Sequence, residues 1–237
     1  MTRAAEPAAA DQHSGPAPGR GEATRQAIVE TALGLFRERG YDKTTMRAIA
    51  TEAGVSVGNA YYYFASKEHL VQAFYDQLHE EHVHRVRAVL DREPAFADRL
   101  ASALQTWLEV ASPYHAFAGK FFKNAAEPTS PLSPFSAESA PARDASIALF
   151  REVLEGSDAK VDPHLRPELP ELLWLAHMGV VLFWVHDTSP EQARSQALVT
   201  QAVPLLDRLV GLTRLRVLRP VTRQLVDLLH AISTSGR

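Results

Sequence analysis

Residues Gly54 to Lys67 combine side chains that can bind a polyanion. Three tyrosines, Tyr61 to Tyr63, follow one another directly, near an asparagine, two serines and a closing lysine. No carboxylate interrupts the stretch from Val55 to Lys67. Hydroxyl and amide groups hydrogen-bond phosphates and base edges, and a lysine adds a positive charge. We therefore interpret this stretch as an element that reads DNA.

Helix geometry limits how these aromatic rings can point. A helix advances about 100° per residue, so three consecutive tyrosines on a short helix cannot all face a core. We expect at least one ring to face outward, one to pack inward, and Phe64 to belong to the core. From Lys43 to Lys67, three cations oppose one carboxylate, a net charge of +2. Because this charge is small, binding must also depend on hydroxyls, amides and helix N-termini.

The surrounding sequence predicts the helices that would hold this element. Residues 24–39 carry one apolar stripe and stop at Gly40, which is typical of a helix C-terminus. A second helix begins at a cap provided by Thr44 or Thr45 and breaks at Gly54. Ser56 then caps a third helix. Two short helices joined by a glycine turn, after a supporting helix, indicate a helix-turn-helix.

These residues resemble a known family. The span from Thr24 to Tyr75 resembles, without a gap, the DNA-binding domain of the tetracycline-repressor (TetR) family, and the matching motifs are Ala32 to Tyr41, Thr44 to Val55 and Ser56 to Leu70. The resemblance covers about fifty residues and implies an all-α, homodimeric, cytoplasmic regulator, most often a repressor that a small molecule releases from DNA. It says little about the other two-thirds of the chain, which diverge widely in that family.

The resemblance also implies residue roles. Thr45 and Arg47 would meet DNA at the start of the second helix, although a salt bridge from Arg47 to Glu52 or Asp42 is an alternative. Asn59 is the best candidate for base reading, because an amide both donates to and accepts from an adenine edge. At Lys67, either the ammonium or the helix-end amides would hold a phosphate. The expected DNA-binding residues are Thr45, Arg47, Ser56, Val57, Gly58, Asn59, Tyr61, Tyr62, Tyr63 and Lys67.

Composition excludes several other classes. The chain has 237 residues, of which 46% are hydrophobic, and it contains no cysteine, so disulfides and thiolate chemistry are excluded. The N-terminus lacks the apolar core of a signal peptide, so we expect a cytoplasmic protein. The longest charge-free apolar run, Leu172 to Val185, is shorter than the ~20 residues that span a membrane. The net charge of −3 neither favours nor forbids DNA binding, because the local charge decides.

We divide the chain into a disordered arm (1–21), a helix-turn-helix domain (22–68) and a helical domain for ligand binding and dimerisation (69–237). A long helix from Ser66 to about Arg92 would connect the two domains. The further helices are expected at 98–110, 112–125, 142–155, 171–186, 190–215 and 220–232. Residues 127–143, rich in proline and serine, would be a lid or a disordered connector.

The body is expected to dimerise and to bind an effector. By the family resemblance, the helices at about 171–186 and 190–215 would pair across the dimer axis. A hydrophobic small molecule would bind among large or polar side chains on the body helices. The candidates for this site are Trp107, Phe117, Phe121, Trp174, His177 and Phe183, although each can also be ordinary core.

Two other functions compete with a DNA-binding regulator. An enzyme would need a nucleophile motif, a phosphate loop or a metal-ligand spacing, and the sequence has none of these, so we assign no catalytic residue and no cofactor. His79 and His82 lie three apart on one helix, but we expect a solvated helix face there rather than a metal site. An interaction module that has lost DNA binding is disfavoured because Asn59, Tyr61, Tyr62 and Lys67 are intact.

Overall fold

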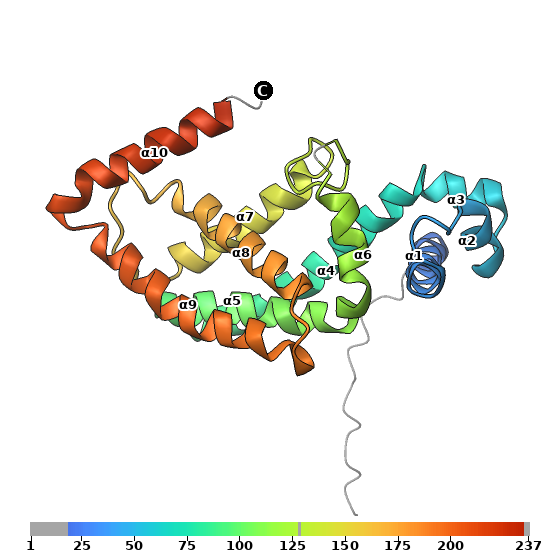
Figure 1. Cartoon of the computed structure of the whole chain (residues 1–237), viewed down its shortest axis with the longest axis horizontal. Helices are drawn as coiled ribbons and strands as arrows, with labels where there is room; N and C mark the ends of the chain where they lie inside the picture. The colour runs from blue at the N-terminus through green and yellow to red at the C-terminus, as the bar shows by residue number, and fades with distance from the viewer. Residues whose placement is uncertain (1–18, 128, 235–237) are drawn as a thin grey trace, which may run out of the picture.

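The computed structural model describes residues 19–127 and 129–234, and every regular element in these ranges is a helix (Figure 1). The all-α prediction is therefore confirmed. The first three helices, α1 (Arg20–Arg39), α2 (Met46–Glu52) and α3 (Val57–Tyr63), form a compact unit that we call the head. Helix α1 begins at Arg20, before the expected residue 24, so the last two residues of the expected arm (1–21) already belong to it. Residues 1–18 of that arm lie outside the described residues.

The long helix α4 (Lys67–Leu90) runs from the head into the rest of the molecule, as the sequence predicts (Figure 1). It contributes Leu70, Val71 and Phe74 to the buried cluster of the head, and Val86 and Leu90 to the cluster of the body. One helix is therefore part of both hydrophobic cores. The proposed division between residues 68 and 69 falls within its first turn, so a displacement of α4 in the body would be carried to the head.

The remaining elements form the body. They are α5 (Phe96–Ala111), η1 (Ser112–Tyr114), α6 (His115–Ala125), α7 (Ala140–Glu155), α8 (Leu169–Val185), η2 (Pro190–Gln192), α9 (Ala193–Leu212), η3 (Arg216–Leu218) and α10 (Arg219–Thr234). Helix α5 packs against α4 and α9, and α7 packs against α8 (Figure 1). Within the described residues, no helix is both long and apolar enough to cross a membrane.

Two body helices begin earlier than the sequence analysis expects. We placed their starts at residues 142 and 171, each directly after a proline. In the structure α7 begins at Ala140 and α8 at Leu169, with Pro141 and Pro170 inside their first turns. Proline is compatible with the first turn because the N–H that it lacks would have no partner within the helix. Both boundaries are corrected for this reason.

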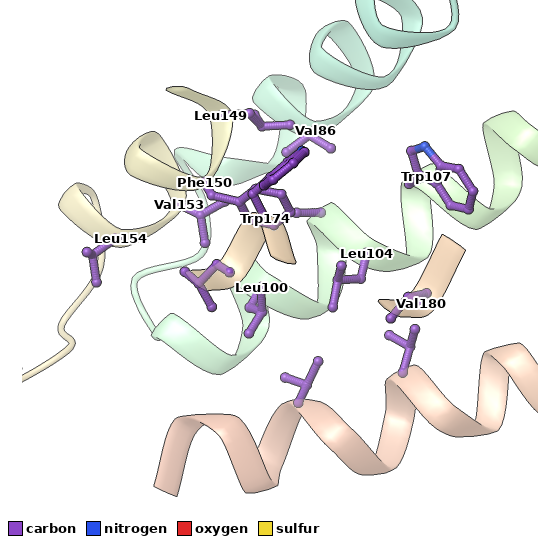
Figure 2. Close-up of a cluster of buried hydrophobic side chains, with 14 of the residues drawn as sticks. Val86, Leu100, Leu104, Trp107, Leu149, Phe150, Val153, Leu154, Trp174 and Val180 are labelled. Carbon is purple, nitrogen blue, oxygen red and sulfur yellow. The ribbon is translucent and has the colours of Figure 1, made fainter. Parts of the chain in front are cut away.

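The body core is built from large aliphatic and aromatic side chains. Figure 2 shows side chains of α4, α5, α7 and α8 pointing toward one another, with Phe150 and Trp174 among them. Phe150 and Leu100 are almost completely buried. Burial of such side chains is the main force that holds the helices together.

Residues 129–139, between α6 and α7, form a series of tight turns. Leu132 is buried against the head cluster, and the Arg143 guanidinium donates hydrogen bonds to the carbonyls of Pro134 (2.8 Å) and Ser136 (3.2 Å). These contacts hold the described part of the segment on the protein surface. From its composition we expected a lid or a disordered connector. The composition did not reveal that Leu132 would be buried.

Candidate DNA interface and body cavity

The turn between α2 and α3 is fixed by local hydrogen bonds. The Thr45 hydroxyl caps α2 by accepting a hydrogen bond from the Ala48 amide at 3.2 Å. Gly54 has a φ of +68°, in the left-handed region that favours glycine. The Val55 amide then donates to the Ala50 carbonyl at 3.0 Å and closes the turn. This geometry sets the angle at which α3 leaves α2.

Helix α3 is anchored by one face. The Ser56 hydroxyl caps it by accepting a hydrogen bond from the backbone N–H of Asn59 at 3.1 Å, as the sequence predicts. Ala60 and Phe64 are buried, and the guanidinium carbon of Arg25 lies 5.3 Å from the centroid of the Phe64 ring. Because α3 is short, Ala60 and the C-cap Phe64 hold one side of it against the head and leave Tyr61 and Tyr62 exposed.

The outward side of α3 carries five of the ten residues that we expected to contact DNA. Tyr62 is 81% exposed and Tyr61 is 51% exposed. Val57 and Gly58 are exposed at the start of the helix, and Asn59 is half-buried. A Cβ added at Gly58 would meet nothing within 4 Å, so the backbone here is open to close approach. The exposed part of α3 thus presents two phenols and accessible backbone, together with the half-buried Asn59 amide.

Tyr63 is the tyrosine that turns inward. It packs against the hydrophobic cluster of the head, and its hydroxyl would lie 3.6 Å from a Cβ added at Gly21 of α1. Its ring also meets the Tyr62 ring edge-on, with the centroids 5.2 Å apart. Tyr63 therefore supports the position of Tyr62, and its expected contact with DNA backbone stays a prediction.

Lys67 is held within the protein. Its ammonium donates a hydrogen bond to the Tyr41 carbonyl at 2.8 Å and lies 4.2 Å from the centroid of the Tyr41 ring. The Tyr41 hydroxyl in turn donates to the Glu68 carboxylate at 2.6 Å. Of the two phosphate contacts expected at Lys67, this arrangement favours the helix-end amides over the ammonium.

The Tyr41 to Glu68 contact also shows in the two pKa values. Burial raises the pKa of Tyr41 above its usual range, and the neighbouring Glu68 carboxylate raises it further. Burial alone would raise the pKa of Glu68, but hydrogen bonds from Ser66 and Tyr41 outweigh it and lower that pKa. Tyr41 thus stays a neutral donor. Sequence reasoning missed this residue, because nothing in its local pattern points to a partner 26 or 27 residues away.

Arg47 and Thr45 are both exposed at the N-terminal end of α2. The ion pairs of the described residues join Arg25 to Glu22, Arg85 to Glu81 and Arg87 to Glu152. Arg47 takes part in none of these, so the alternative salt bridge to Glu52 or Asp42 does not form.

A second cluster of functional side chains lies inside the body, around His177 of α8. His177 is 3% exposed, and its Nδ1 has no hydrogen-bond partner. Its ring lies edge-on to Trp107, with the centroids 5.1 Å apart, and 5.6 Å from the Phe150 ring. Burial, with a smaller contribution from the nearby His82, lowers the pKa of His177 to about 3, so the imidazole is neutral.

His82 faces the same interior and corrects one expectation. We placed His79 and His82 on a solvated helix face, but His82 is 2% exposed and its Nε2 pairs with the Ala103 carbonyl at 2.8 Å. Its ring stacks on that of His177, with the centroids 6.3 Å apart. The described residues contain no group of three or more potential ligands that could hold a metal ion.

A small apolar cavity of about 90 Å³ lies between α4, α5, α6 and α8. Trp107 and Trp184 form part of its wall and meet edge-on, with the centroids 5.2 Å apart. Phe74 and Tyr75 line it from α4, and burial raises the pKa of Tyr75 to about 12. The wall therefore includes the α4 segment two turns beyond Lys67. A wider, open groove of about 470 Å³ between α4 and α7 carries His79, His84 and Arg87.

The predicted ligand residues fall in different places. Trp107 lines the cavity, His177 lies behind Trp107, and Trp174 is buried in the core, where its ring meets that of Phe135. Phe183 is 42% exposed on the outer side of α8. The backbones of Phe117 and Phe121 belong to α6, but their side chains lie outside the described residues.

The outer faces of α8 and α9 expose a row of large apolar side chains. Leu205, Leu209 and Leu212 of α9 are between 45% and 57% exposed, and Leu182 and Phe183 of α8 are also exposed. Their spacing of three and four residues places the leucines on one side of α9. An exposed row of apolar side chains on a helix is typical of a surface that binds another protein.

Both the N-terminal and the C-terminal part of the chain match known protein families. Residues 28–74 match the family described as "Bacterial regulatory proteins, tetR family". Residues 99–232 match the family described as "Tetracyclin repressor-like, C-terminal domain". The second match alone covers more than half of the chain.

Among curated proteins, the chain is 48% identical to the transcriptional regulator TtgR of Pseudomonas putida over 65 residues, which cover 27% of this chain and 31% of TtgR. It is 33% identical to the transcriptional repressor KstR2 of Mycobacterium tuberculosis over 102 residues, or 41% of this chain and 49% of KstR2. The chain thus spans less than half the length of these relatives. They are transcriptional regulators, not enzymes.

Solved structures resemble the chain over most of its length. The regulator FadR of Bacillus subtilis, solved in complex with stearoyl-CoA, covers 76% of this chain and 96% of its own, with a TM-score of 0.60 and 17% identity. A TetR regulator from Nitrosomonas europaea covers 77% and 97%, with a TM-score of 0.59 and 16% identity. Similarity at this level of identity concerns the fold alone.

Proposed function

Because this chain belongs to the TetR family of transcriptional regulators, we propose that it is a homodimeric repressor that binds a pseudo-palindromic operator and leaves it when a small hydrophobic effector binds. The observation that carries the DNA-binding half is the outward face of α3, where Tyr61 and Tyr62 are exposed while Ala60 and Phe64 anchor the helix. Such a regulator acts on genomic DNA and hence in the cytoplasm.

The assigned contacts follow from the chemistry of that face. Asn59 reads a base edge, and Val57 and Gly58 allow the helix tip to approach the groove. Tyr61 and Tyr62 hydrogen-bond phosphates, together with Thr45, Arg47, Ser56 and the amides at the start of α4. This larger group positions the protein on the duplex, and Asn59 supplies most of the sequence preference.

Dimerisation is needed because one short helix reads too few base pairs to select a site in a genome. A two-fold dimer presents two copies of α3 about one DNA turn (~34 Å) apart, or a multiple of it, and so reads a pseudo-palindrome. The exposed leucines of α9, with Leu182 and Phe183 of α8, are the surface that we assign to this contact. Burying them between two protomers removes apolar area from water.

The effector acts through α4. The apolar cavity touches Phe74 and Tyr75, on the same helix that begins at Lys67 beside α3. A ligand that prefers a body with a different α4 position would change the distance between the two α3 helices of the dimer and release the operator, by differential affinity alone. The Bacillus subtilis neighbour was solved with stearoyl-CoA, a molecule with a long apolar chain, which supports a hydrophobic effector.

A mobility-shift titration on DNA surrounding the protein's own gene tests the proposal. We expect a specific complex of two protomers per site, whose affinity falls as salt rises. Hydrophobic compounds are then added to the complex, and we expect at least one class to release the DNA. Equal binding to all DNA sequences would contradict the operator assignment. A specific complex that no compound releases would contradict the effector assignment alone.

A further inference from the structure

His177 is a buried polar group without a partner. Its Nδ1 makes no hydrogen bond, although the residue is 3% exposed. Buried polar groups in folded proteins are almost always hydrogen-bonded, and an orphan costs stability, so each one needs an explanation. Its neighbour His82 shows the usual state, because its Nε2 pairs with the Ala103 carbonyl.

The surroundings of His177 are aromatic and lie beside the cavity. Trp107 touches His177 on one side and lines the cavity on the other. Val181, one helical turn after His177 on α8, also lines the cavity. Displacement of the Trp107 side chain would therefore open the cavity toward the His177 ring, which carries the unpaired Nδ1.

The size of the cavity requires such a movement. Ligand sites in proteins usually enclose about 300–1,000 Å³, and this cavity measures about 90 Å³. The described side chains that line it are uncharged, so an anion or cation would be buried there without a partner, which is strongly unfavourable. The neutral imidazole can instead donate or accept one hydrogen bond, depending on its tautomer.

We propose that the effector is a neutral, mostly aromatic molecule with one hydrogen-bonding group, which displaces Trp107 and pairs that group with Nδ1 of His177. This inference rests on the regulator function proposed above and names the chemistry of its effector. It makes His177 the residue that selects a hydroxyl-bearing or carbonyl-bearing ligand over a hydrocarbon of the same shape.

Phenol and toluene are suitable probes because they are similar in size and differ in one hydroxyl. Their dissociation constants are measured on the full chain by tryptophan fluorescence, for the unchanged protein and for His177→Phe. Toluene partitions better into any apolar site, so the informative quantity is the ratio of the two constants, compared between the proteins. We expect His177→Phe to reduce the preference for phenol about tenfold, because one buried hydrogen bond is lost.

Two further variants complete the test. His177→Asn places an amide near the position of Nδ1 and should keep most of the preference. His115→Phe is the control, because His115 also lies beside Trp184 but its Nε2 already pairs with the Trp184 carbonyl at 2.8 Å, so the ratio should not change. Circular dichroism and operator binding show that each variant is folded.

An unchanged ratio in His177→Phe would overturn the inference, and so would the absence of binding of both probes to the unchanged protein. Either result leaves the regulator function standing if the unchanged protein still binds its operator specifically. Loss of specific operator binding would instead contradict the function itself, whatever the probe ratio.

Discussion

The ammonium of Lys67 lies over the ring of Tyr41 and donates to the carbonyl of the same residue, with a distance of 4.2 Å to the ring centroid and 2.8 Å to the oxygen. This pair ties the first residue of α4 to the connection between α1 and α2. Since α4 also lines the body cavity, the pair connects the head to the helix through which we propose that the effector acts. Glu68 strengthens it by accepting the Tyr41 hydroxyl.

Replacement of Lys67 by alanine tests this role. Lys67→Ala removes a cation–π contact and a hydrogen bond, so we expect the free energy of unfolding to fall by about 1 kcal/mol, measured by urea denaturation. Operator affinity should fall alike on all DNA sequences. Because the ammonium is held internally, the slope of log affinity against log salt should barely change. A loss of about one unit of slope per protomer would instead indicate a direct phosphate contact.

Base reading and backbone binding should separate within α3. Asn59→Ala is expected to cost about 1–3 kcal/mol on the operator and little on unrelated DNA, because it removes a base contact. Tyr62→Phe removes one hydroxyl from the most exposed ring and should weaken both kinds of DNA by about the same factor. Fluorescence anisotropy with operator and scrambled duplexes measures both. The assignment fails if the two variants change the ratio of specific to non-specific affinity equally.

The head was largely predictable from sequence because its signals are local. Caps at Thr45 and Ser56, and the break at Gly54, lie within a few residues of the helices that they delimit, and the structure confirms them. Tyr63 shows the limit of this reasoning. Helix geometry requires one tyrosine to face outward but does not say which one turns in, since that depends on its contact with α1.

The body was less predictable because its decisive contacts join distant parts of the chain. The sequence around His82 resembles a solvated helix face, and contacts with α5 and with His177 of α8 bury that side chain. The lack of a hydrogen-bond partner for Nδ1 of His177 could not be predicted either, because it depends on side chains from other helices. Arg99 is a third example, because its guanidinium binds carbonyl groups up to 54 residues away.

Arg99 should be essential for the stability of the body. It is 6% exposed, and its guanidinium donates to the carbonyls of Glu93 (3.0 Å), Glu152 (2.9 Å) and Val153 (2.9 Å), and to that of Leu90. The Leu90, Glu152 and Val153 carbonyls lie at the C-terminal ends of α4 and α7, where a positive charge is favourable, and Glu93 follows α4. Arg99→Met leaves them unpaired, and we expect a loss of about 3 kcal/mol or more by urea denaturation.

Gly156→Ala tests the position of the Arg99 guanidinium, which lies next to Gly156. A Cβ at Gly156 would overlap the Arg99 guanidinium, so that side chain would have to move. Gly156 has a φ of −79°, so backbone strain plays no part. We expect Gly156→Ala alone to lower the free energy of unfolding. In a protein that already carries Arg99→Met, the same change should have almost no effect. Additive losses would show that the two residues are not coupled.

Acid should weaken the fold through its buried histidines. Burial lowers the pKa of His177 to about 3 and that of His82 to about 4, from an unfolded value of 6.5. As the pH falls below about 6.5, these histidines bind protons in the unfolded chain but not in the folded protein. The free energy of unfolding therefore decreases toward pH 4. Each histidine contributes at most about 1.4 kcal/mol per pH unit. Urea titrations at several pH values should show a shallower decrease for His177→Phe, and an identical decrease would contradict the assigned burial.

A charge placed in the exposed leucine row of α9 should separate the protomers. Leu209 is 51% exposed on the same side of the helix as Leu205 and Leu212. In a dimer, Leu209→Glu would bring two carboxylates into an apolar contact without partners, which is strongly unfavourable. We expect sedimentation to change from dimer to monomer and operator affinity to fall at least a hundredfold, because one α3 alone reads too little DNA. Thr200→Glu is the control, since Thr200 is exposed on a different side of α9 and should leave both measurements unchanged. A dimeric Leu209→Glu protein would place the interface elsewhere.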